Sequence, residues 1–183
     1  MSAANAVFCT SLLNADSALL REVLLAQRRG EGCLPPMLGL DVWTYQAMLR
    51  FCGEASELPL EAHHGHLRQT LLDLRRDEWQ DIRGLLLSGI REHNVLTDWW
   101  AAIVAAGCLG GNHLWRDLGL PNRQALGTLL LQYFPGVAQK NVRDMRWKKF
   151  FYKQLCEAEG GYVCRSPTCE QCTLYAECFG EET

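Results

Sequence analysis

The sequence predicts an all-α fold, a helical bundle-like domain with a cysteine-rich loop at its C-terminal end. Apolar residues recur at three- and four-residue steps as far as about residue 155, which is the period of an amphipathic helix. No sustained apolar–polar alternation, the period of a half-buried strand, interrupts this pattern. We divide the chain into a helical domain, residues 1–139, and a C-terminal part, residues 140–183, which together form one compact unit.

Two helices are expected in the first third of the chain. The first begins at Ser17, whose hydroxyl can cap it, and ends near the glycine-containing segment 28–32. The proline pair at 35–36 breaks helical structure because proline lacks a backbone donor. A second helix is expected from Asp41 to Cys52, and its apolar stripe consists of Trp43, Ala47 and Phe51.

Residues 53–67 are polar and read as a connector. The next helix ends near Asn94, and its core-facing positions are Trp79, Ile82, Leu86 and Ile90.

Two further helices complete the predicted domain. Thr97 or Asp98 caps the first, which closes at Gly107 and the glycines after it. Pro121 suits the first position of the second, which runs to segment 134–136. Their inward positions are Trp100, Ile103 and Val104 in one, and Leu126, Leu129, Leu130 and Tyr133 in the other.

The composition changes sharply at residue 140. Residues 140–153 carry six basic side chains and one acid, whereas residues 154–183 carry six acids and one arginine. Trp147, Phe151 and Leu155 recur at four-residue steps, so we expect a basic helix with one buried apolar stripe that leads into an acidic tail.

Length and charge limit the function classes. A chain of 183 residues fits one domain, and its formal charge of −3 argues against general affinity for nucleic acid or anionic membranes. The N-terminal segment has no basic stretch before an apolar core, and the longest apolar run, 99–111, is too short to span a bilayer. We therefore expect a cytoplasmic protein.

Four of the nine cysteines form a cluster near the C-terminus. Cys164, Cys169, Cys172 and Cys178 have the spacing C-x4-C-x2-C-x5-C within fifteen residues. Disulfides need an oxidising compartment, and structural zinc sites usually place two close ligand pairs a dozen or more residues apart. The spacing is better suited to a short chain that wraps around a bulky cluster. It therefore favours iron–sulfur chemistry over zinc or disulfide chemistry.

The remaining cysteines are expected to be small buried hydrophobic side chains. Cys156, eight residues before the cluster, is interpreted in the same way rather than as a fifth ligand. The set is Cys9, Cys33, Cys52, Cys108 and Cys156.

One resemblance is to iron–sulfur DNA glycosylases, which carry a similar four-cysteine loop. Segment 134–140, FPGVAQK, resembles their hairpin, whose final lysine is catalytic. The position expected for the catalytic aspartate is Ala158, however, and only 23 residues separate Lys140 from Cys164. This reading is the weaker one.

A closer resemblance is to the NifQ family of nitrogen-fixation proteins. Segments 110–120 (GGNHLWRDLGL), 143–156 (RDMRWKKFFYKQLC) and 178–182 (CFGEE) look like that family's characteristic segments, and the match extends from about Leu34 onward. The resemblance implies a metallocluster carrier, not an enzyme, that donates molybdenum for the iron–molybdenum cofactor of nitrogenase. A structural zinc-binding interaction protein remains the alternative.

Carried onto this sequence, the resemblance makes Cys164, Cys169, Cys172 and Cys178 the cluster ligands. The implied cargo is a 4Fe-4S or 3Fe-4S cluster that converts to Mo-3Fe-4S, with molybdate as the molybdenum source. The implied partners are the cofactor-assembly scaffold complex NifEN and the nitrogenase iron protein NifH. Delivery further suggests that one of the four sites is labile.

The histidines are secondary candidates. His63, His64 and His66 lie in the polar connector, where a solvated loop is the plainer interpretation and a molybdate or partner contact the alternative. His113 either caps or bridges two helices or contacts a ligand or oxyanion. The basic segment 140–153 has four alternative interpretations. It is a solvated helix face, it neutralises the charge of the cluster, it attracts molybdate, or it docks an acidic partner.

Overall fold

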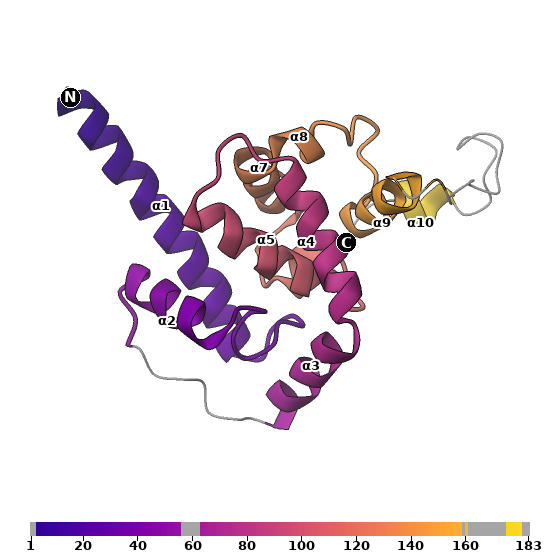
Figure 1. The fold of residues 1–183 in the computed structure, drawn as a ribbon, viewed down its shortest axis with the longest axis horizontal. Coiled ribbons are helices and arrows are strands. Elements are labelled where there is room, and N and C mark those ends of the chain that lie inside the picture. Colours follow the sequence, from indigo (N-terminus) through magenta and orange to yellow (C-terminus); the bar gives the residue numbers. More distant parts are fainter. Residues whose placement is uncertain (1–2, 56–62, 159, 161–174, 181–183) are drawn as a thin grey trace.

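The computed structural model describes residues 3–55, 63–158, 160 and 175–180. Every regular element of these residues is a helix, which confirms the all-α prediction (Figure 1). The predicted cysteine-rich loop falls mainly on residues 161–174, outside the described residues. The helices are α1 (Ala3–Arg28), α2 (Val42–Phe51), α3 (His63–Leu74), α4 (Arg76–Ser88), α5 (Val95–Cys108), α6 (Leu114–Asp117), α7 (Arg123–Tyr133), α8 (Pro135–Ala138), α9 (Trp147–Ala158) and α10 (Tyr175–Phe179).

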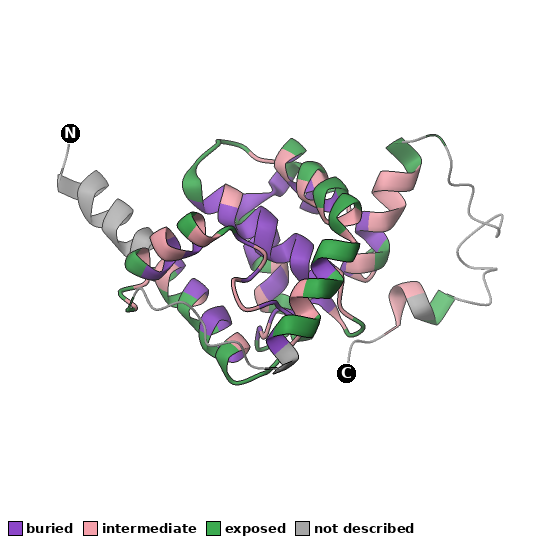
Figure 2. Ribbon diagram, turned by 60° about the horizontal axis from the view of Figure 1, so that its bottom comes forward, coloured by how far each residue is buried: buried purple, intermediate pink, exposed green. Residues whose placement is uncertain are grey.

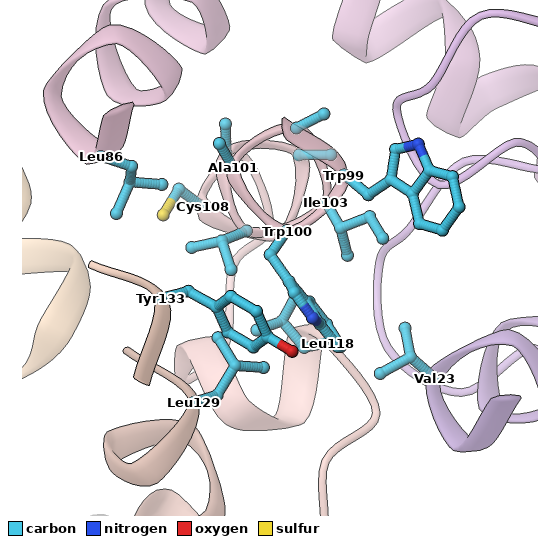
Figure 3. Close-up of a cluster of buried hydrophobic side chains, with 14 of the residues drawn as sticks. Val23, Leu86, Trp99, Trp100, Ala101, Ile103, Cys108, Leu118, Leu129 and Tyr133 are labelled. Carbon is cyan, nitrogen blue, oxygen red and sulfur yellow. The ribbon is translucent and has the colours of Figure 1, made fainter. Parts of the chain in front are cut away.

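Helix α5 is the centre of the fold. Its sequence is apolar all round, and it is buried on nearly every side, as such a helix must be in water (Figure 2). Side chains from α1, α4 and α7 surround it (Figure 3). Trp100 is fully buried and packs on Tyr133, with ring centroids 6.0 Å apart. The inward positions predicted for this helix are therefore confirmed.

The other helices form a shell around α5. Helix α4 contacts α5, α8 and α9, and α6 contacts both α5 and α7. Helices α1 and α2 lie on one side of α5, whereas α9 and α10 lie on the opposite side (Figures 1 and 2). This arrangement places α10 far from α1 and α2 (Figure 1).

Helix α2 has the predicted bounds but a different buried face. Asp41 caps it by accepting hydrogen bonds from the Trp43 and Thr44 amides, both at 3.0 Å. Trp43 is 78% exposed, so the predicted stripe is wrong at that position. The buried positions are Tyr45, Met48 and Leu49.

Several helix boundaries differ from the predictions because contacts between distant residues decide them. Ser17 lies inside α1, one residue after Asp16, which is buried and accepts hydrogen bonds from Tyr133 and from Gln132 on α7. Helix α4 ends at Ser88 rather than near Asn94. The chain leaves the helix there because the Gly89 carbonyl accepts a hydrogen bond from the Gly136 amide at 2.8 Å.

The caps of the next two helices lie a few residues away from the predicted ones. Asn94 caps α5, and Thr97 supplies the reciprocal half of the capping box rather than the cap itself. Asn122, not Pro121, precedes the first turn of α7 and accepts a hydrogen bond from the Ala125 amide. The prediction of the apolar face of α7 is confirmed.

In two segments the structure differs from the sequence predictions. Residues 63–74, partly interpreted as connector, form α3, which has few buried side chains and exposes Leu67, Leu71 and Leu74. The basic helix begins at Trp147, not at Lys140. The turn before it is held by the Asn141 side chain, which accepts from the Met145 amide and donates to the Met145 carbonyl.

No helix in the described part of the chain combines the length and the apolar character needed to cross a bilayer.

The Gly89–Gly136 contact gives a test of the packing between α4 and α8. A Cβ at Gly89 would lie 2.5 Å from Val137 Cγ2 and 2.6 Å from the Val137 amide nitrogen. We expect Gly89→Ala to lower the free energy of unfolding by about 1–3 kcal/mol, the usual cost of overpacking.

Gly84 on α4 is the matched control, since nothing lies within 4 Å of a Cβ added there. Gly84→Ala should raise the free energy of unfolding by about 0.5–1 kcal/mol, because alanine favours a helix interior. Urea denaturation of both variants measures the difference, and equal effects would refute the packing argument.

Candidate metal centre

Only one of the four predicted cluster ligands lies within the described residues. Cys178 is half-buried on α10 and packs against the main hydrophobic core. Cys164, Cys169 and Cys172 lie outside the described residues, so their convergence on a cluster stays a prediction. In the described part of the chain, no three His, Cys, Asp or Glu side chains are grouped closely enough to hold a metal ion.

Cys178 is held beside the start of α9. The Arg146 amide donates a hydrogen bond to the Cys178 carbonyl at 2.7 Å, and Arg146 Nε donates to the Gly180 carbonyl at 3.3 Å. The Arg143 guanidinium lies over the Phe179 ring, 5.7 Å from its centroid. The last cysteine of the motif is therefore attached to the folded body (Figure 1).

A buried ion pair fixes α9 in turn. Lys148 Nζ lies 2.5 Å from Asp117 Oδ2 and donates to the Gly110 carbonyl at 2.7 Å. The Asp117 side chain is fully buried, and that of Lys148 is 17% exposed. Asn112 donates from its amide to Asp117 at 2.9 Å and from its side chain at 3.3 Å. These bonds satisfy the carboxylate, which is costly to bury without partners.

Helix α9 has a second attachment through its aromatic face. Trp147, Phe150 and Phe151 are buried in the core. Tyr152 donates a hydrogen bond to Glu78 on α4, and Glu78 pairs with Arg75 at 2.6 Å. Burial and the hydrogen bond to Glu78 raise the pKa of Tyr152 above its ordinary value. The phenol therefore stays protonated and continues to donate throughout the physiological pH range.

Burial disfavours metal binding at three of the other described cysteines, Cys33, Cys52 and Cys108. Burial raises the pKa of Cys33 and of Cys108 to about 12, and that of Cys52 to about 11. A metal binds the thiolate, so such thiols bind it weakly at neutral pH. The prediction of a buried side chain is confirmed for Cys108, whereas Cys33, Cys52 and Cys156 are half-buried. The Cys9 side chain lies outside the described part.

The histidines do not gather in a site among the described side chains. His63 and His64 begin α3, although their side chains lie outside the described set, and His66 is exposed. His113 occupies the cap position of α6 without a capping hydrogen bond from its side chain, so the capping half of the expectation is wrong. Its bridging of two helices stays a prediction, and the residue also lines a cavity next to α9.

Sequence reasoning missed Asp117 and Arg146. Asp117 is the one acidic residue of segment 114–120, LWRDLGL. A single acid between apolar residues could have indicated a buried carboxylate with a charged partner. Arg146 was one of six basic residues in a segment judged only by its total charge.

Together these features define a small all-helical protein whose cysteine-bearing C-terminal segment is fastened to a basic, aromatic helix. The family model described as NifQ matches residues 19–180. Protein NifQ of Azotobacter vinelandii is 51% identical over 175 residues, covering 92% of this chain and 90% of that protein. Protein NifQ of Klebsiella pneumoniae is 37% identical over 163 residues, covering 87% and 96%. No solved structure matches the chain.

The chain therefore belongs to the NifQ family of nitrogen-fixation proteins.

The contribution of the buried Asp117–Lys148 pair to stability can be tested by substitution. Asp117→Asn removes one charge and leaves Lys148 without its partner in a largely buried position. We expect the free energy of unfolding to fall by about 3–5 kcal/mol, the usual cost of breaking a buried pair. Urea denaturation followed by tryptophan fluorescence measures the loss.

Asp73→Asn is the control for this change. Asp73 pairs with Arg76 at 3.2 Å, and both side chains are about half exposed. Its loss should cost less than about 1 kcal/mol. Similar losses in the two variants would show that the Asp117–Lys148 pair does not fasten α9.

Proposed function

We propose that this protein is a metallocluster carrier, not a turnover enzyme, that donates molybdenum for assembly of the iron–molybdenum cofactor of nitrogenase. The observation that carries the proposal is the family match, since the matched residues 19–180 include the whole C-x4-C-x2-C-x5-C motif. The alternative, a structural zinc-binding protein, has the same donor set but no reason to belong to a nitrogen-fixation family.

The donor set suits an iron–sulfur cargo. Four thiols within fifteen residues can supply thiolates to iron at the corners of a cubane. A 3Fe-4S unit lacks one corner, and its sulfides are soft donors that a molybdenum atom can join to give Mo-3Fe-4S. We propose Cys164, Cys169, Cys172 and Cys178 as the ligand positions, with one of them exchanging during delivery.

The recipient that we propose is the cofactor scaffold complex NifEN, acting together with the iron protein NifH. The supporting feature is the exposed positive charge on α9 near the motif. Lys149 is exposed, and Lys153 is partly exposed and pairs with Glu157 at 3.5 Å on the helix surface, whereas Lys148 is largely buried against Asp117. Docking of an acidic partner would therefore use Lys149 and Lys153 rather than Lys148.

The ligand assignment predicts the metal content of cysteine variants purified under strict anaerobiosis. Serine at position 164, 169, 172 or 178 removes a thiolate, so each variant should retain much less iron per chain than the wild type. At least one of the four variants should lose molybdenum more readily than iron, because the cysteine that it replaces binds the labile site of the cluster. Metal analysis and electron paramagnetic resonance measure both.

Cys52→Ser is the matched control, because Cys52 ends α2 on the side of the molecule away from α10 (Figures 1 and 2). It should keep the wild-type metal content. A colourless wild-type protein with stoichiometric zinc and no iron would contradict the carrier function and support the structural zinc site. Equal loss of both metals in all four variants would contradict a labile corner.

The donor role predicts that molybdenum moves from this protein to the scaffold. Molybdenum-loaded protein mixed anaerobically with NifEN and NifH should support cofactor synthesis without added molybdate, whereas its metal-free form should not. Failure of the loaded protein, in a mixture that responds to molybdate alone, would exclude donation.

A further inference from the structure

A cavity lies beside the attachment point of Cys178. It has a volume of about 380 Å³ and is bounded by the turn 110–113, by Arg116 on α6 and by residues 146–149 at the start of α9. At about 30 Å³ per liquid water, this space accommodates a small anion together with several waters. Leu114 and Trp147, both buried, form its apolar part.

The charged residues that line the cavity are all basic. Lys148 is neutralised by Asp117, which lies beneath the turn, fully buried, and does not line the cavity. Arg116, Arg146 and Lys149 contribute three further cations, and none of the described residues that line the cavity is acidic. A concave surface with several cations concentrates anions, because its walls focus the field.

The lining groups are also the donors that an oxyanion requires. Guanidinium groups present paired N–H donors to tetrahedral and planar oxyanions, and an ammonium adds three more. The Arg116 guanidinium lies over the Trp115 ring, 5.0 Å from its centroid, which helps to hold it at the cavity. His113 adds an imidazole at the opposite end of the short α6 helix.

The cavity shares Arg146 with the candidate cluster ligand. The same residue lines the cavity and holds Cys178 and Gly180 through its amide and its Nε atom. An anion in the cavity would therefore lie next to the segment that carries the last cysteine of the motif.

We propose that this cavity is a binding site for a tetrahedral divalent oxyanion, and that the oxyanion is molybdate, held next to the segment that carries Cys178. The class of ligand follows from the cations and the size of the cavity. The choice of molybdate within that class rests on the proposed function.

The test is oxyanion binding by the full-length protein, measured by isothermal titration calorimetry at constant ionic strength with molybdate, tungstate, sulfate and phosphate. Molybdate should bind to the wild type, and the double variant Arg116→Gln/Lys149→Gln should bind at least about a hundredfold more weakly. Each lost charge-assisted hydrogen bond costs about one factor of ten or more. Lys149→Arg should restore most of the binding that Lys149→Gln loses.

Lys153→Gln is the matched control, since Lys153 lies one turn further along α9 and does not line this cavity. It should bind molybdate as the wild type does. Absence of molybdate binding to the wild type, or equal binding by the double variant, would overturn the site. Sulfate or phosphate binding as tight as that of molybdate would overturn its assignment to molybdate.

Iron content, measured on the same anaerobic preparations, separates this proposal from the carrier function. Protein that retains iron but binds no molybdate in the cavity refutes the oxyanion site and leaves the carrier function standing. Protein that binds molybdate through Arg116 and Lys149 but holds no iron on its cysteines supports the oxyanion site and refutes the cluster carrier.

Discussion

The pairing of Lys148 with the buried Asp117 is the contact on which the C-terminal part of this structure depends. The apolar face of α9 alone could slide along α4, because hydrophobic contacts have little directional preference. The ion pair and the Lys148 bond to Gly110 fix one register of α9 against the 110–117 segment. That register in turn sets the position of Arg146, and through it the position of Cys178. A buried pair adds little net stability when compared with an apolar pair, so positional specificity is the better reason for it here.

The described cysteines include buried or half-buried thiols in or beside the core, and one member of the cluster motif, Cys178 on α10. Cys33 and Cys108 lie in or beside the core, where burial raises the pKa of each thiol to about 12, so they remain neutral and weakly nucleophilic. The cluster motif is confined to the segment after α9, and its one described member, Cys178, is only half-buried. The proposed carrier function would benefit from this division, because neutral thiols in the core compete poorly for iron.

The sequence predicted those features that depend on local spacing. The bounds of α2 and the inward faces of α5 and α7 followed from apolar periodicity and caps, and the cysteine motif followed from the intervals between four residues. Predictions failed where partners far apart in the chain decide the outcome. Asp117 meets Lys148 31 residues later, and Gly89 meets Gly136. Such contacts leave no periodic signal, so neither the end of α4 nor the role of Asp117 could be read from the sequence.

The cation-lined cavity and the cysteine motif have a common electrostatic requirement. On the proposed function, a cluster bound by thiolates would be anionic, and it would repel an oxyanion lying within the screening length, about 8–10 Å at physiological salt. Arg146 lines the cavity and also holds Cys178 and Gly180, so its positive charge would offset negative charge at either place. Coupling between two sites is reciprocal. If a change in cluster charge altered the affinity for the oxyanion by some factor, bound oxyanion would shift the equilibrium between those two cluster states by the same factor. If both proposals hold, the less negative states of the cluster should bind the oxyanion most tightly.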